Sequence, residues 1–153
     1  FTNFDAEGNL SSAMLEKLGF FIDKKRENEV AEQMMKEFNV HPQRLEQNIV
    51  NFSGGNQQKI VLARWVAAHK KIVLLDEPTR GVDVGAKQEI YDNLRRLASE
   101  GIGIIIFSSE TNELLSSSDR ILIMREGQIV KELITAKTSS EEILTYSIAA
   151  AEA

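Results

Sequence analysis

The stretch IVLLDEP at residues 72–78 decides the fold. Its four apolar residues predict a buried strand, and two adjacent carboxylates follow at the end of that strand. Downstream, an amphipathic pattern predicts a helix over residues 84–99 that stops at Gly101, and a second apolar run predicts another buried strand over residues 102–107. Strands that alternate with helices are typical of parallel sheets, so this half of the chain is predicted to be α/β.

The rest of the chain carries simpler local signals. Before residue 39 an apolar face at helical spacing predicts a helix, which Asn39 and Pro42 would end. Towards the C-terminus, Glu126-Gly127 between two apolar runs predicts a hairpin over residues 121–133, and capping-box spacing predicts a last helix near Ser139. The predicted buried faces consist of Ala31, Met34, Met35 and Phe38 in the first helix and Ile90, Leu94, Leu97 and Ala98 in helix 84–99.

The pair Asp76 and Glu77 ends the first predicted strand, where open α/β sheets bind their ligands. An Asp at this place can hold a Mg²⁺ ion that bridges nucleotide phosphates, and the neighbouring Glu can orient and deprotonate a water molecule. The structural alternative is that both acids cap the turn that follows.

A glycine-rich turn, FSGGNQQK at residues 52–59, leads directly into an apolar helix pattern. The first amides of a helix lack partners within it, the helix dipole is positive there, and Gly54 and Gly55 let a phosphate approach the backbone. The alternative is a plain N-cap at Ser53. The segments TRGVD at 79–83 and FSSE at 107–110 add an N-cap candidate, Asp83, and a polar loop.

Composition limits the classes of function. With 153 residues, 42% hydrophobic and 27% charged, the chain is expected to form one ordinary globular domain. A net charge of −5 argues against binding to nucleic acid, and the lack of cysteine excludes disulfides and zinc–thiolate sites. The apolar runs are far shorter than the ~20 residues of a membrane-spanning helix. The start FTNFD, without Met or signal peptide, leads us to expect a fragment.

In this order and spacing the four segments resemble the ATP-binding-cassette (ABC) family, as its signature motif, Walker B strand, D-loop and switch-loop strand. Residues 51–130 carry the resemblance, and GNQQK at 55–59 with TRGVDVGAK at 79–87 is similar to the second cassette of bacterial ribose, galactose and xylose importers. The resemblance implies a partial P-loop NTPase (ABC cassette) fold. Residues 1–70 would form a helical subdomain ending in the signature helix, and residues 71–153 the later half of the α/β ATPase core, with the hairpin and last helix.

For the signature, the resemblance implies that Ser53, Gly54 and Gly55 contact the γ-phosphate of an ATP held by an opposing cassette. Asn56 belongs to the same binding motif, but it stands where the signature normally has Gln, so its amide reaches one methylene less far.

For the ATPase core, the resemblance implies that Asp76 helps to bind Mg²⁺, that Glu77 is the general base, and that Asp83 communicates across the interface between cassettes. Ser109 stands at the catalytic switch position, where the family normally has His. A serine cannot carry a positive charge towards the γ-phosphate, so hydrolysis at this domain's own site is expected to be weak.

The implied cofactors are ATP and Mg²⁺, and the implied partners are a second nucleotide-binding cassette and a membrane permease subunit. Such a protein would be cytoplasmic and peripheral to the cytoplasmic face of the cell membrane. Substrate choice would reside in the permease and an external binding protein, so the sugar is not readable here. No nucleic acid is expected as a partner.

The 153 residues contain no Gly-x-x-x-x-Gly-Lys-Ser/Thr pattern, which would supply the backbone cradle and the lysine for the β- and γ-phosphates. We therefore expect the chain alone neither to bind ATP tightly nor to hydrolyse it, and to self-associate into a homo-oligomer through strands with unpaired backbone groups. One alternative is a non-catalytic module that pairs with a complete cassette or with itself. Another alternative is a soluble cassette of translation or DNA repair, but the importer-like sequence around Asn56 and Arg80 argues against it.

Three residues outside these segments are predicted to be structural. His41 and His69 are expected at the surface, not as ligands. Trp65 could face a membrane-protein partner, but packing in the core is the favoured interpretation.

Overall fold

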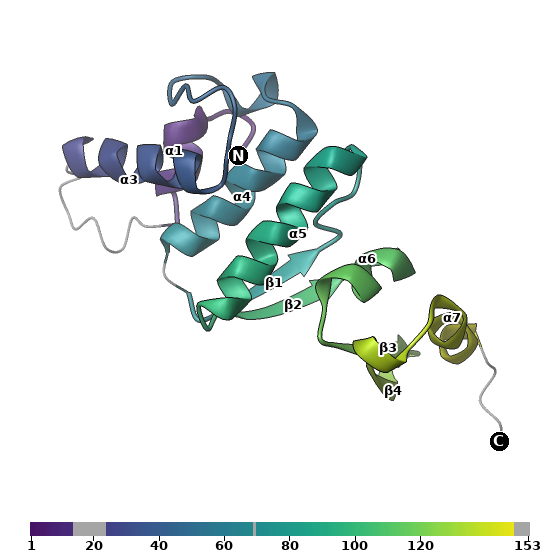
Figure 1. The fold of residues 1–153 in the computed structure, drawn as a ribbon. Helices are drawn as coiled ribbons and strands as arrows, with labels where there is room; N and C mark the ends of the chain where they lie inside the picture. The colour runs from purple at the N-terminus through teal and green to yellow at the C-terminus, as the bar shows by residue number, and fades with distance from the viewer. Residues whose placement is uncertain (14–23, 69, 149–153) are drawn as a thin grey trace. The chain divides into compact units, whose positions relative to one another are not determined.

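The computed structural model describes residues 1–13, 24–68 and 70–148 (Figure 1). The chain divides into two compact units, of which the first holds residues 1–73 and 79–104 and the second holds residues 74–78 and 105–153. Helices and strands alternate in the later half of the chain, as the sequence predicts. The predicted domain boundary between residues 70 and 71 stays a prediction.

The first unit is mainly helical (Figure 1). Its elements are α1 (Ala6–Ser11), α3 (Lys24–Glu37), the short 3₁₀ helix η1 (Ile49–Asn51), α4 (Gly54–Ala67) and α5 (Val84–Ser99). Helices α1, α3 and α4 pack against one another, and α4 also packs against α5. The predicted faces of α3 and α5 are buried, and their side chains include Ala31, Met34, Met35, Phe38, Ile90, Leu94 and Leu97.

Two predictions about side chains in this unit were wrong. Trp65 of α4 is 40% exposed, because it lies on the side of the helix away from the buried Ala63 and Ala67. Ala98 of α5 is exposed as well, and the large side chain that is buried beyond the predicted set is Tyr91. His41 is exposed, as expected, and His69 lies outside the described residues.

Helix α3 ends in a Schellman motif. Val40 N–H donates to the Met35 carbonyl at 2.9 Å, and Asn39 N–H donates to the Lys36 carbonyl at 3.1 Å. Asn39 has the positive φ of 51° that this motif requires, which Asn tolerates better than most residues. The prediction that Asn39 ends the helix is therefore confirmed.

Strands β1 (Ile72–Asp76) and β2 (Gly103–Phe107) pair in a two-stranded sheet. Gly103 N–H donates to the Lys71 carbonyl at 2.9 Å, and Glu77 N–H donates to the Phe107 carbonyl at 2.8 Å. Since these bonds join start with start and end with end, the strands run parallel, as predicted.

The apolar runs predict strands that are buried on both faces, but the structure leaves one face of each strand exposed. Burial alternates along β1, and the exposed apolar side chains of the pair are Ile72 at 60%, Leu74 at 62%, Ile105 at 48% and Phe107 at 46%. Strands of a parallel sheet lose all exposure only where other elements cover both faces. Within the described residues, one face of this sheet has no such cover.

The second unit contains α6 (Thr111–Ser117), β3 (Arg120–Arg125), β4 (Gln128–Ile134), the 3₁₀ helix η2 (Thr135–Lys137) and α7 (Ser140–Ile148). Strands β3 and β4 form the predicted antiparallel hairpin, with an irregularity between Ile123 and Met124. Its turn residues Glu126 and Gly127 have φ of 51° and 79°, which fits a type I′ turn. A small core lies beneath it, made of Ile121, Ile123, Leu133 and Ile143 with Leu114, Leu115 and Tyr146 packed against them.

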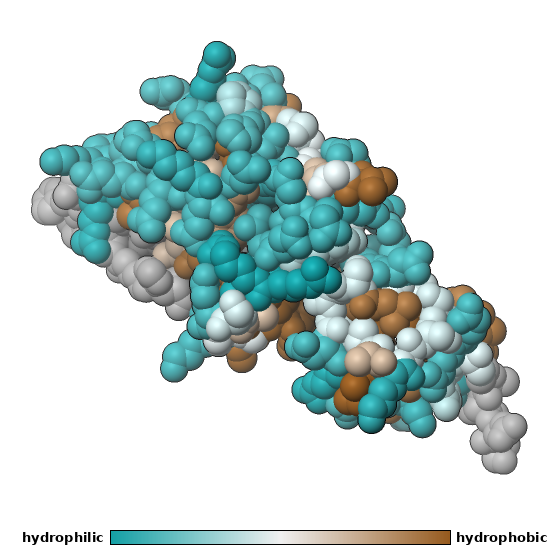
Figure 2. All heavy atoms as spheres, viewed as in Figure 1, coloured by the Kyte–Doolittle hydropathy of each residue, from teal (hydrophilic) through white to brown (hydrophobic). Residues whose placement is uncertain are grey.

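The outer side of the hairpin is partly apolar. Figure 2 shows hydrophobic side chains at the surface of the part of the chain that carries β3, β4 and α7, and the exposed ones on the two strands include Leu122, Met124, Ile129 and Ile134. Within the described residues no helix is long and apolar enough to cross a membrane.

Candidate functional site

The glycine-rich turn places Ser53 at the N-cap position of α4, in the first unit. Ser53 has the extended backbone of an N-cap, but its side chain makes no capping hydrogen bond to the helix. Its Oγ instead accepts a hydrogen bond of 2.9 Å from Asn56 Nδ2. The N-cap position predicted by the structural alternative is confirmed, whereas the hydroxyl group is not used for capping.

The two glycines of this turn have different surroundings. A Cβ atom on Gly55 would lie 2.6 Å from Ala86 Cβ, closer than real Cβ contacts come, so only glycine fits where α4 meets α5. A Cβ atom on Gly54 would lie 3.6 Å from the Gly81 carbonyl, an ordinary contact. Gly54 is exposed and Gly55 is buried, so Gly54 presents the more accessible backbone of the pair.

The turn at residues 79–83 lies next to this glycine pair in the first unit. Val82 N–H donates to the Thr79 carbonyl at 3.2 Å, and Gly81 has a φ of 74°, the glycine position of a type II turn. Asp83 Oδ1 then accepts from Ala86 N–H at 3.0 Å, so Asp83 is the N-cap of α5, as predicted. The capping role accounts for this carboxylate within the described residues, and communication across an interface stays a prediction.

The strand-end carboxylates lie in the second unit, together with Ser109. Glu77 Oε1 accepts a hydrogen bond of 2.9 Å from the backbone N–H of Ser109, so the structure brings these two predicted catalytic positions together. Glu77 also has a φ of 46°, in the left-handed region that is uncommon for residues with a side chain. The Asp76 carboxylate is exposed and makes no hydrogen bond or ion pair with another described residue.

The contact to Glu77 comes from the backbone of Ser109, not from its side chain. The sequence indicates position 109 only through its side chain, so this backbone bond could not be predicted. Every residue except proline can supply the N–H, so the residue type gives no signal for it.

A protein-only metal site is not present in the part of the chain that the structure describes, which holds no group of three or more His, Cys, Asp and Glu side chains able to bind a metal ion. Mg²⁺ in nucleotide sites is usually held by one or two carboxylates together with phosphates and water. The exposed Asp76 carboxylate fits that second kind of site.

A network of polar side chains next to the glycine-rich turn could not be predicted from the sequence. The ammonium group of Lys59, which is only 5% exposed, forms an ion pair with Glu89 and donates to the Asn39 carbonyl at 2.9 Å. The hydrogen bond from Lys59 is the main cause that lowers the pKa of Glu89. Asn39 Oδ1 lies 2.8 Å from His41 Nε2, and His41 N–H donates to Asn56 Oδ1 at 2.9 Å. The one sequence signal is that Lys59 follows Gly55 by one helical turn, which places the two residues on the same side of the predicted helix.

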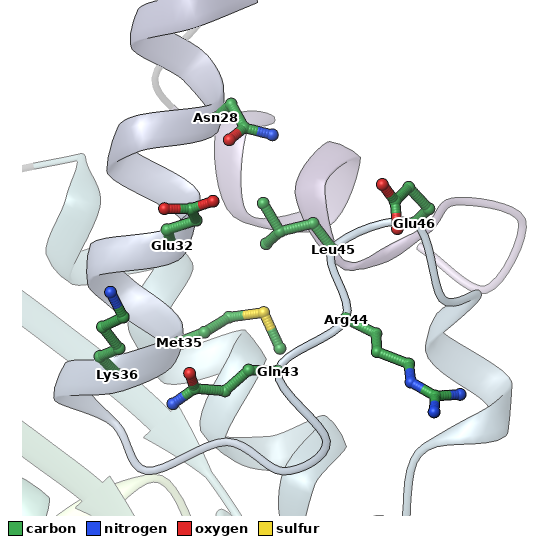
Figure 3. A pocket seen from close by; sticks show the side chains of 8 residues that line it. All are labelled: Asn28, Glu32, Met35, Lys36, Gln43, Arg44, Leu45 and Glu46. Atoms are coloured by element: carbon green, nitrogen blue, oxygen red, sulfur yellow. The ribbon is translucent and has the colours of Figure 1, made fainter.

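A pocket of about 320 Å³ lies between α3 and residues 43–46 (Figure 3). Two acidic and two basic side chains line it, so it has no clear preference for a charged ligand. None of the predicted site residues is among its lining, which consists of Asn28, Glu32, Met35, Lys36, Gln43, Arg44, Leu45 and Glu46.

Comparison with known proteins assigns the chain to a family. The family model described as ABC transporter matches residues 2–80. The chain is 47% identical over 133 residues to the arabinose import ATP-binding protein AraG 1 of Burkholderia ambifaria, a match that covers 86% of the chain and 26% of that protein. It is 44% identical over 127 residues to the ribose import ATP-binding protein RbsA of Oceanobacillus iheyensis, covering 83% of the chain and 26% of that protein. The chain thus spans about a quarter of the length of these relatives.

Solved structures support the fold. The ATP-binding cassette MJ0796, in a dimeric post-hydrolysis state bound to ADP and Pi, superposes with a TM-score of 0.76 at 20% identity, covering 88% of the chain and 58% of the cassette. The cassette MJ1267 of an ABC transporter gives a TM-score of 0.74 at 20% identity, covering 94% of the chain and 59% of that structure. The chain therefore has a partial ABC cassette fold, as predicted.

Proposed function

Because the chain belongs to the ABC transporter family, we propose that it is part of the ATP-binding subunit of a sugar importer, in which ATP hydrolysis drives uptake of the sugar. The observation that carries the proposal is the strand-end carboxylate pair, in which Glu77 is held by the Ser109 amide and Asp76 is left exposed. The names of the arabinose- and ribose-import relatives support a sugar as the transported substrate.

The carboxylates divide the chemistry between them. Asp76 would hold Mg²⁺ together with the nucleotide phosphates, and the bound ion would neutralise charge that develops on the phosphoryl group. Glu77 acts as the general base, and the hydrogen bond from Ser109 N–H limits the positions of its carboxylate so that it can accept a proton from the attacking water.

The glycine-rich turn would bind a second nucleotide, held by another cassette. The first amides of α4 have no partners within the helix and lie at its positive end, beside the exposed Ser53 and Gly54. They suit the γ-phosphate of an ATP held by an opposing cassette. Such a pair of cassettes would work with a membrane permease subunit at the cytoplasmic face of the membrane.

The test is ATP hydrolysis by the complete subunit that contains this chain, assembled with its permease. Glu77→Gln keeps the size of the side chain and removes the base, so we expect turnover to fall by about a hundredfold or more while ATP still binds. Full turnover in Glu77→Gln would contradict the proposal.

A matched pair of variants tests the amide of Ser109. Ser109→Ala retains the backbone N–H that holds Glu77, whereas Ser109→Pro removes it. We expect Ser109→Ala to keep most of the activity and Ser109→Pro to lose about tenfold or more, with the unfolding temperature recorded for both as a control of folding. Equal activity of the two variants would show that the bond is unimportant for turnover.

A second candidate is a non-catalytic module that pairs with a complete cassette. It is favoured by the absence of a Gly-x-x-x-x-Gly-Lys-Ser/Thr pattern from the 153 residues. Mixing the purified chain with a complete cassette distinguishes the two candidate functions. ATP hydrolysis that is lost in Glu77→Gln supports the catalytic role. Binding of the chain to the cassette, with ATP hydrolysis that is the same in Glu77→Gln, supports the non-catalytic module.

A further inference from the structure

The amide of Asn56 lies between two groups whose chemistry fixes its orientation. Its Oδ1 accepts from the His41 backbone N–H, and its Nδ2 lies 2.9 Å from Ser53 Oγ. A backbone N–H can only donate, so the carbonyl oxygen of the Asn56 amide must face His41. The NH₂ group then faces Ser53.

This orientation decides what the Ser53 hydroxyl can do. The NH₂ group of an amide donates and does not accept, so Ser53 Oγ must be the acceptor of this bond. A hydroxyl carries one hydrogen, which is therefore left for another acceptor. Ser53 is exposed and its side chain makes no capping bond, so a phosphate oxygen arriving at the start of α4 is a suitable acceptor.

The segment that presents the His41 N–H is itself held in place. Lys59 lies on α4 one turn beyond Asn56, and its ammonium group donates to the Asn39 carbonyl. Asn39 Oδ1 lies within hydrogen-bond distance of His41 Nε2, and Lys59 is also paired with Glu89 of α5. Because these contacts join the end of α3 to α4 and α5, the N–H that orients Asn56 has a defined position.

We propose that Asn56 is a positioning residue that makes the Ser53 hydroxyl a hydrogen-bond donor to the nucleotide phosphate, with the segment held by Lys59 fixing the orientation of Asn56. The inference rests on the proposed function, since that assigns the phosphate contact to Ser53. Asn56 acts through Ser53 and need not touch the nucleotide.

A double-mutant cycle tests this, measured as ATP turnover by the complete subunit with its permease. The variants are Ser53→Ala, Asn56→Ala and the combination of both, with Gln58→Ala as the matched control. Gln58 is an amide on the same helix that has no side-chain hydrogen bond with another described residue.

We expect Ser53→Ala to lower kcat by about tenfold, the effect of one hydrogen bond to a charged group in the transition state. Asn56→Ala should lower kcat severalfold in the wild-type background and cause no further loss in Ser53→Ala, because its effect passes through the hydroxyl. Gln58→Ala should leave kcat unchanged. A merely structural role of Asn56 would instead lower kcat in both backgrounds.

Independent losses that multiply in the double variant would overturn the inference and leave the proposed function intact. If Ser53→Ala alone has no effect, the assigned phosphate contact fails and the inference fails with it. Asn56→Asp distinguishes loss of the hydrogen-bond donor from loss of folding. It retains the acceptor for His41 N–H and removes the donor to Ser53. It should lower kcat at an unchanged unfolding temperature while Gln58→Glu, with the same change in charge, does not. Full activity of Asn56→Asp would also overturn the inference.

Discussion

Gly54 and Gly55 are adjacent in the sequence and have different steric surroundings in the fold. A methyl group on Gly55 would meet Ala86 Cβ at 2.6 Å, so we expect Gly55→Ala to destabilise the chain by roughly 1–3 kcal/mol, the usual cost of overpacking. Gly54→Ala should change stability by at most about 1 kcal/mol, since its nearest contact is an ordinary 3.6 Å. Urea unfolding of the two variants measures the difference.

A second substitution identifies the cause of the loss. If the clash with Ala86 is responsible, Gly55→Ala combined with Ala86→Gly should regain most of the lost stability, because the two changes are coupled. Ala86→Gly alone serves as the control for the lower helix propensity of glycine. Losses that simply add would contradict the packing explanation.

Several residues of the site could be predicted from the sequence because their signals are local. Asp83 caps α5, and Asp76 and Glu77 end β1, all within a few residues of the pattern that predicts them. The bond from Ser109 N–H to Glu77 could not be predicted, because it joins residues 32 apart through a backbone group that nearly every residue carries. The pairing of Lys59 with Glu89 joins two side chains that are 30 residues apart, so no local pattern in the sequence indicates it.

Among the elements, α5 follows its prediction most closely, from Val84 to Ser99. Its end is a Schellman motif in which Ile102 N–H donates to the Leu97 carbonyl at 3.1 Å, and Gly101 N–H donates to the Ala98 carbonyl at 3.0 Å. Helices α1 and α6, of 6 and 7 residues, carry too little periodicity to be predicted. The exposure of one face of β1 and β2 depends on which elements cover them, which an apolar run does not show.

The end of α5 provides a prediction at the scale of one element. Gly101 has a φ of 90°, which a Cβ atom makes unfavourable, so Gly101→Ala should destabilise the chain by about 1–2 kcal/mol. Asn tolerates a positive φ better, and Gly101→Asn is expected to lose less. Thermal unfolding of both variants tests the order, and an equal loss would contradict a backbone cause.

The ion pair between α4 and α5 makes stability depend on pH. The pKa of Glu89 is lowered in the folded chain, mainly by the hydrogen bond from Lys59, so the folded state favours the ionised carboxylate. This stabilisation is fully present above the ordinary pKa of about 4.5 and is lost as the pH falls through the lower, folded value. Glu89→Gln should therefore reduce stability at pH 7 and flatten its decline below about pH 4.5.

Urea unfolding at a series of pH values measures this dependence. Glu29→Gln is the control, because Glu29 is exposed and makes no ion pair with another described residue. A Glu89→Gln chain whose stability declines in acid as steeply as the wild type would show that another carboxylate is responsible.

For the whole molecule, the uncovered face of β1 and β2 predicts self-association of the chain when it is studied alone. Leu74, Ile105 and Phe107 present apolar side chains there, from 46% to 62% exposed. Ile105→Lys should weaken association in sedimentation velocity, whereas Ile129→Lys, at a 60% exposed position on the hairpin, should not. A chain that is monomeric over a wide range of concentration would contradict this prediction.

The close approach of Gly55 to Ala86 and of Gly54 to Gly81 also has a mechanical meaning. The atoms nearest to the two glycines are the Gly81 carbonyl, Ala86 Cβ and Val82 Cγ1, so the two turns that begin α4 and α5 are in close contact. We therefore expect a displacement of the turn at residues 79–83 to shift the turn at residues 53–56 as well. On this basis the two turns should move together when either of them binds a ligand or a partner.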